Sequence, residues 1–125
     1  MRAKRILIVE DDAALRRVFR MALAIAGYDV QEAGDGYEAL QLVENDRPDL
    51  VVLDLILRAV DGLSVQQELA SRAPTSDIPI VVVTGSTIDT STLDVACVLH
   101  KPVTPEDLIY TVSQCLHAGS PVEPA

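Results

Sequence analysis

Residues 50–57 read LVVLDLIL, and this stretch decides the fold. Seven of these eight residues are large aliphatic residues, and the exception is Asp54. A short run that is apolar throughout, instead of alternating with polar residues, is typical of a parallel strand covered on both faces. Burying an uncompensated carboxylate among such neighbours costs on the order of several kcal/mol. We therefore expect a buried strand that ends at an aspartate whose charge another group must compensate.

The rest of the chain alternates short aliphatic runs with segments of helical periodicity. Strands are expected at Arg5–Val9, 28–33, 50–54, 78–84 and 96–100, and helices at 13–26, 35–45, 63–73 and from Thr104 onwards. Gly27 supplies a stop for the first helix, and Thr104-Pro105 has the threonine cap and first-turn proline of a helix start. This βαβα order with short connections predicts an α/β fold with one parallel, doubly wound sheet of five strands.

The segment before the fifth expected strand does not have a clear helical pattern. Residues 86–94, STIDTSTLD, are rich in serine and threonine and show little apolar periodicity. We therefore expect a short or irregular fourth crossover helix.

Length and composition are those of a single globular domain. The chain has 125 residues, of which 49% are hydrophobic, enough to bury one core. Its net charge of −9 argues against direct binding to nucleic acid or to a membrane surface, because phosphate groups would be repelled. The N-terminal apolar run is too short for a signal peptide, and no run is long enough to span a bilayer, so the cytoplasm is the expected location.

One domain is expected over residues 1–118, followed by a polar tail or the start of a linker over 119–125. Cys97 and Cys115 lie in apolar surroundings without metal-ligand spacing, and we expect them to be small buried hydrophobic residues in a reducing compartment.

Acids, a hydroxyl and an amine stand where the expected strands end. In open α/β sheets, chemistry collects at this carboxyl edge. Clustered carboxylates need a cation to stay ionised, and oxygen ligands without paired His or Cys favour Mg²⁺. The acids after the first strand, taken alone, could also be a solvated helix start, but the joint placement favours a site. The residues are Glu10, Asp11 and Asp12 after the first strand, then Asp54, Thr84 and Lys101 at the ends of the third, fourth and fifth strands.

Four segments together resemble the receiver domain of two-component response regulators. They are ILIVEDDAALRR, PDLVVLDLIL followed by VDG, IPIVVVTG, and HKPVTPEDL, and they cover nearly the whole chain. Each segment is a weak signal alone, whereas all four in this order are highly specific. The resemblance implies a flavodoxin-like fold with strand order 2-1-3-4-5.

The resemblance also implies a chemistry. Asp54 would accept a phosphoryl group from a phosphohistidine on a sensor histidine kinase or histidine phosphotransfer protein, in a Mg²⁺-dependent reaction. Asp11 and Asp54 would bind the metal directly, Glu10 mostly through water, and Ile56 through its backbone carbonyl. Lys101 would contact the phosphoryl oxygens and Thr84 would bind them after transfer, which is consistent with positioning and charge neutralisation as the main needs of phosphoryl transfer.

Further implications concern the neighbours of these residues. Asp12 would cap the first helix, and the Lys101-Pro102 peptide bond is often cis in this family. The partner kinase would dock on the first helix near Val18, Arg16 and Arg17, although a solvated helix face is an equally good account of the two arginines.

Three departures from the family pattern bear on output. Val98 stands where an aromatic residue is usual, three positions before the lysine. The segment from Thr84 to Lys101 is several residues shorter than is typical. The loop over residues 58–62 lacks the usual proline.

Other functions fit less well. A flavodoxin-like cofactor binder would need a Ser/Thr/Gly-rich phosphate loop where this chain has Glu10-Asp11-Asp12. An aspartyl phosphatase would need a second acid at Ile56. The strongest alternative is a pseudo-receiver that acts by protein contact without phosphorylation, and a stand-alone domain and a piece of a larger protein such as a hybrid kinase remain equally open.

Overall fold

The computed structural model describes residues 2–57, 60–72, 74–85, 87 and 89–118. Its centre is a parallel five-stranded sheet in the order β2-β1-β3-β4-β5, which confirms the expected fold class and strand order. The strands are β1 (Arg5–Val9), β2 (Asp29–Ala33), β3 (Leu50–Leu53), β4 (Ile80–Thr84) and β5 (Cys97–His100).

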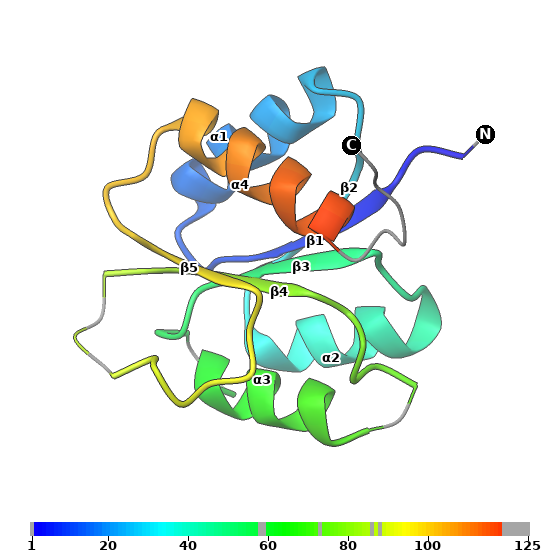
Figure 1. Ribbon diagram of the computed structural model, residues 1–125, viewed down its shortest axis with the longest axis vertical. Helices are drawn as coiled ribbons and strands as arrows, with labels where there is room; N and C mark the ends of the chain where they lie inside the picture. Colours follow the sequence, from blue (N-terminus) through cyan, green and yellow to red (C-terminus); the bar gives the residue numbers. More distant parts are fainter. Residues whose placement is uncertain (1, 58–59, 73, 86, 88, 119–125) are drawn as a thin grey trace.

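Two layers of helices cover the sheet (Figure 1). On one face lie α1 (Ala13–Ile25) and α4 (Pro105–Ala118), and on the other lie α2 (Gly36–Asn45) and α3 (Gly62–Ser71). Alternate residues of a strand point to opposite faces, so β1 sends Ile6 and Ile8 into one buried cluster and Leu7 and Val9 into the other. The central strands are thus apolar throughout because both of their faces are buried.

The helices begin where short polar side chains satisfy their free N–H groups. The Asp12 carboxylate accepts from the backbone N–H groups of Ala14 and Leu15, which confirms Asp12 as the cap of α1. Thr104 caps α4 through Asp107 N at 3.0 Å. Gly27 ends the first helical segment with φ of 103°, a conformation that side chains disfavour.

The fourth crossover is a loop. Among its described residues, 85, 87 and 89–96, the structure has no helix, in line with the expected irregular segment; Ser86 and Ile88 lie outside the described residues. Leu93 and Val95 pack against the cluster on the α2–α3 side, so this part of the loop helps to cover that face of the sheet. Gln66 Nε2 on α3 donates to the Asp94 carbonyl at 3.2 Å, so the loop is tied to the neighbouring helix.

A few expectations need adjustment. Cys97 and Cys115 are free thiols but are half-buried instead of buried, because both lie at the margin of the cluster beneath α1 and α4. Strand β3 ends at Leu53, so Asp54 is the first residue beyond it. The expected tail at 119–125 lies outside the described residues. In the part of the chain that the structure describes, every helix is too short or too polar to cross a membrane.

Candidate metal centre

Three carboxylates meet at the carboxyl edge of the sheet. One oxygen each of Glu10, Asp11 and Asp54 lies within 4.8 Å of the other two. Backbone hydrogen bonds extend the strand ladders past β1 and β3 and fix this arrangement: Glu10 N donates to Ala33 O at 3.1 Å, and Asp54 N donates to Val9 O at 3.0 Å. Glu10 and Asp54 are 2% and 4% exposed, so their charges are largely removed from water.

Lys101 supplies the positive charge next to these acids. Its Nζ lies 2.8 Å from Asp54 Oδ2 and 2.9 Å from Glu10 Oε1. The backbone N of Lys101 donates to the Thr84 carbonyl at 3.0 Å, which carries the β4–β5 pairing one residue beyond β5. The following peptide bond, to Pro102, is cis, as the family resemblance implied.

The electrostatics of the site follow from burial and from these contacts. Burial raises the pKa of Glu10 above its ordinary 4.5, and the Asp54 carboxylate raises it further, while the bond from Lys101 opposes both. Burial lowers the pKa of Lys101, but its hydrogen bonds to Asp54 and Glu10 outweigh burial and leave that pKa raised. With all groups ionised, three carboxylates and one ammonium leave a formal charge of −2 (−3 + 1).

This donor set fits a hard divalent cation. The three side chains offer oxygen atoms only, they come within 4.8 Å of one another, and they carry more negative charge than Lys101 neutralises. Oxygen ligands suit Mg²⁺, which binds through one or two carboxylates and keeps several waters. The acidic cluster thus has the composition of a site for a divalent metal ion.

The remaining residues predicted for the site lie close in the fold. Thr84 is the last residue of β4 and is completely buried at the same edge. Ile56 is exposed, and its backbone N donates to Asp54 Oδ1 at 3.0 Å. The backbone N of Asp12 donates to Glu10 Oε2 at 3.1 Å, so this residue orients Glu10 while its own carboxylate caps α1.

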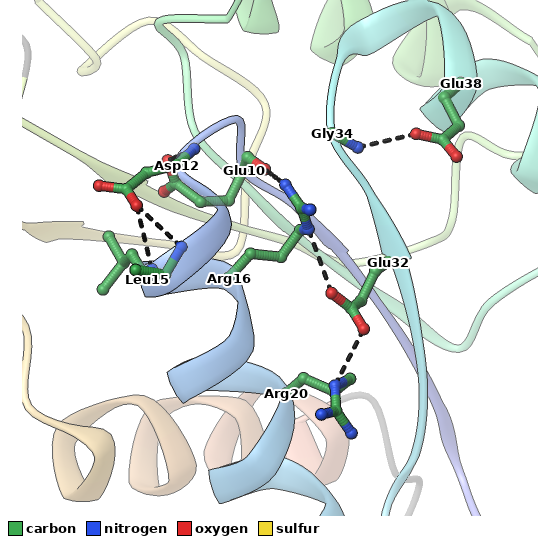
Figure 2. A network of polar contacts seen from close by, with 9 residues as sticks. Glu10, Asp12, Leu15, Arg16, Arg20, Glu32, Gly34 and Glu38 are labelled. Carbon is green, nitrogen blue, oxygen red and sulfur yellow. Dashed lines mark hydrogen bonds and ion pairs between the residues drawn. The ribbon is translucent and has the colours of Figure 1, made fainter.

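Two neighbours of the site were missed by the sequence reasoning. Arg16, expected beside Arg17 on a docking face, instead donates from Nη1 to the carbonyl of Glu10 at 2.7 Å (Figure 2). At Gly62, the first residue of α3, an added Cβ would lie 2.0 Å from the carbonyl oxygen of Asp54. Neither the position of Arg16, six residues after Glu10, nor a glycine at a helix start is a sequence signal of these contacts.

Comparison with known proteins agrees with this geometry. Residues 6–113 match the family described as "Response regulator receiver domain". Response regulator MprA of Mycobacterium sp. (strain KMS) is 40% identical over 127 aligned positions, covering 95% of this chain and 53% of MprA. The chain thus spans about half the length of that curated relative.

Two solved structures share the architecture. A CheY-like response regulator receiver domain protein from Methanospirillum hungatei JF-1 superposes with a TM-score of 0.87 at 27% identity, covering 94% of this chain and 96% of that one. Chemotaxis protein CheY4 of Vibrio cholerae superposes with a TM-score of 0.84 at 25% identity, covering 91% and 99%.

Proposed function

This chain belongs to the receiver-domain family of response regulators in two-component signalling, and from that premise we propose that it accepts a phosphoryl group on Asp54. The phosphoryl donor is a phosphohistidine on a sensor kinase or on a histidine phosphotransfer protein. The observation that carries the proposal is the contact of Lys101 Nζ with both Asp54 and Glu10, beside a third carboxylate from Asp11.

Asp54 is the nucleophile. A new bond forms between one of its carboxylate oxygens and phosphorus, while the bond from phosphorus to the donor nitrogen breaks and the imidazole leaves. Mg²⁺, when bound, neutralises charge on the phosphoryl oxygens and on the acids. Asp11 and Asp54 would hold this ion directly, Glu10 would hold it through water, and Ile56 would hold it through its backbone carbonyl.

Lys101 and Thr84 complete the reaction. The ammonium of Lys101 starts on Asp54 and is free to shift its hydrogen bonds to the incoming phosphoryl oxygens. Thr84, the last residue of the neighbouring strand β4, would bind the phosphoryl oxygens through its hydroxyl after transfer. The resulting movement of Thr84 and the adjoining loop is the signal.

The kinase docks on α1. Val18 is 46% exposed on this helix, and Arg17 beside it is exposed as well. Arg16 does not belong to this docking face, because its guanidinium contacts Glu10 and Glu32 within the domain. The reaction takes place in the cytoplasm, and the domain over residues 1–118 acts alone or within a longer chain such as a hybrid kinase.

A pseudo-receiver is the second candidate, and the fourth crossover favours it. Val98 occupies the position that is usually aromatic, and the preceding loop lacks a helix in its described residues. A domain altered there could signal through protein contact alone, although each acid and the lysine of the acidic site is present.

The test is intact-protein mass spectrometry after incubation with acetyl phosphate, with and without Mg²⁺. We expect a phosphoryl adduct that requires Mg²⁺ and is lost in Asp54→Asn. Asp77→Asn is the matched control, because Asp77 is exposed and does not belong to the acidic cluster. Its partner is Arg47, which lines a groove between α2 and α3. If Mg²⁺ binds but no adduct accumulates, beryllofluoride binding is measured next; if neither metal nor beryllofluoride binds, the pseudo-receiver is correct.

A further inference from the structure

Arg16 links the β1–α1 loop, which carries Glu10 and Asp11, to strand β2. It lies on α1, and its Nη1 donates to the Glu10 carbonyl at 2.7 Å while its Nε lies 3.1 Å from Glu32 Oε1 on β2 (Figure 2). The planar guanidinium can make both contacts at once because its N–H groups diverge in a fixed fork. One side chain thus fixes the position of the β1–α1 loop relative to β2.

The anchor of this contact is itself held in place. Glu32 Oε2 accepts from Arg20 Nε at 2.9 Å, so two arginines one helical turn apart share one carboxylate (Figure 2). An added Cβ at Gly34 would lie 3.4 Å from Arg16 Nη1, which means that the guanidinium lies against the backbone of the β2–α2 loop. The rotamer of Arg16 is therefore restricted from several sides.

The backbone of Glu10 is consequently bonded on both sides. Its N–H donates to Ala33 O on β2, and its carbonyl accepts from Arg16. The first bond holds the peptide plane before Glu10 and the second holds the plane between Glu10 and Asp11, and together they set the directions in which the two acids leave the strand. From this geometry, and resting on the proposed metal-assisted phosphorylation, we infer that Arg16 is a positioning residue that presents Glu10 and Asp11 to the divalent cation.

Charge and geometry make opposite predictions for this residue. Arg16 and Asp11 line the same open hollow, of about 410 Å³, so the positive charge of the guanidinium lies on the approach to an acid of the site. If Arg16 acted through charge alone, its neutralisation would remove a repulsion and tighten the binding of Mg²⁺. If Arg16 acts by positioning, its neutralisation weakens that binding, because groups that orient metal ligands support affinity.

The experiment compares Arg16→Met with Arg20→Met. Both variants remove one cation and one ion pair to Glu32, and both keep an aliphatic stem, but only Arg16 contacts the Glu10 carbonyl. We expect the Mg²⁺ dissociation constant, measured by calorimetry on the folded protein, to rise about tenfold in Arg16→Met. In Arg20→Met the dissociation constant should change by less than about twofold, as for the loss of a partly exposed ion pair.

A metal-free measurement accompanies the titration. The amide of Asp12 donates to Glu10 Oε2, so its hydrogen exchange reports on the geometry of the loop. This exchange should be faster in Arg16→Met than in Arg20→Met at equal global stability. Arg16→Lys keeps the charge but loses the fork, and we expect a dissociation constant between those of the wild type and Arg16→Met.

The outcomes separate this inference from the proposed function. The positioning role would be overturned if Arg16→Met bound Mg²⁺ as tightly as the wild type or more tightly. It would also be overturned if Arg20→Met lost as much Mg²⁺ affinity as Arg16→Met. In both cases the wild type would still form its phosphoryl adduct, so the proposed function would stand. A wild type that binds no Mg²⁺ and forms no adduct would overturn the proposed function, and the inference with it. If Arg16→Met does not fold, the Arg16→Lys variant is decisive. A wild-type Mg²⁺ dissociation constant and a wild-type exchange rate of the Asp12 amide in Arg16→Lys would refute a need for the two-pronged guanidinium.

Discussion

The Nζ of Lys101 lies 2.8 Å from Oδ2 of Asp54, although 47 residues separate them in the chain. Strand β4 lies between β3, which delivers the aspartate, and β5, which delivers the lysine, so the ammonium spans the end of β4. The contact therefore depends on the β4–β5 register that places Lys101 N on Thr84 O. The fourth crossover, which has no helix in its described residues, is compatible with this register and with the contact between Lys101 and the acids.

Replacing Lys101 by methionine should separate metal binding from phosphoryl transfer. The change removes the one ammonium from the cluster and takes its formal charge from −2 to −3. We expect tighter Mg²⁺ binding, because the competing cation is gone, together with a strongly reduced rate of adduct formation from acetyl phosphate. Calorimetry and intact mass measure the two effects. Equal losses in both would contradict the assignment of Lys101 to the transfer step.

The same variant should be less stable without metal. Asp54 and Glu10 would lose a donor while remaining buried, at a cost of about 1–3 kcal/mol in the free energy of unfolding. Saturating Mg²⁺ should restore much of this loss. Lys4→Met is the matched control, since Lys4 is exposed, and its free energy of unfolding should change by less than about 0.5 kcal/mol.

Gly62→Ala should disturb the backbone at Asp54. The new Cβ would lie 2.0 Å from Asp54 O and 2.4 Å from Leu55 Cα, and backbone atoms cannot yield as a flexible side chain can. We expect a loss of about 3 kcal/mol or more, measured by urea unfolding, although alanine is normally favoured in a helix. Gly34→Ala is the control: its nearest neighbour would be a side-chain nitrogen at 3.4 Å, and a similar loss there would argue against the clash.

The raised pKa of Glu10 gives the metal-free protein a pH dependence of known sign. The folded state binds this proton more tightly than the unfolded state, so the contribution of Glu10 to stability is complete below its ordinary pKa of 4.5 and is lost as pH rises through the raised value. Glu10→Gln lacks this dependence. The free energy of unfolding of Glu10→Gln minus that of the wild type should therefore increase as pH rises above 4.5. A difference that does not change with pH would contradict the raised pKa of Glu10.

Much of this fold could be predicted because its strands carry their own signal. Residues 50–57 are apolar because β3 is covered on both faces, and the same reasoning placed β1 and β4. The clustering of Glu10, Asp11 and Asp54 also followed, since parallel strands end at one edge. Helix ends were placed within a few residues by their terminal residues, such as Gly27 after α1 and Thr104 before α4.

The contacts of Arg16 and Gly62 could not be predicted in the same way. From the sequence, an arginine on the polar side of an amphipathic helix is expected to be solvated. The contact of Arg16 with the Glu10 carbonyl depends on the path of the loop after β1, which the sequence pattern does not give. From the sequence, a glycine at a helix start indicates only a local backbone preference. In the structure, Gly62 is required because the carbonyl oxygen of Asp54 leaves no room for a Cβ. Both contacts depend on distances between secondary-structure elements, and these distances cannot be derived from periodicity or composition.

The link between Gln66 and the fourth crossover leads to the last prediction. Gln66 is 3% exposed and donates to Asp94 O, whereas the adjacent Gln67 on α3 is exposed. Gln66→Ala should cost about 1 kcal/mol in local stability and raise the rate of proteolysis in the loop roughly fivefold. Gln67→Ala should leave that rate unchanged. Cleavage mapped by mass spectrometry decides the matter, and equal rates in the two variants would mean that Leu93 and Val95 hold the loop without this hydrogen bond.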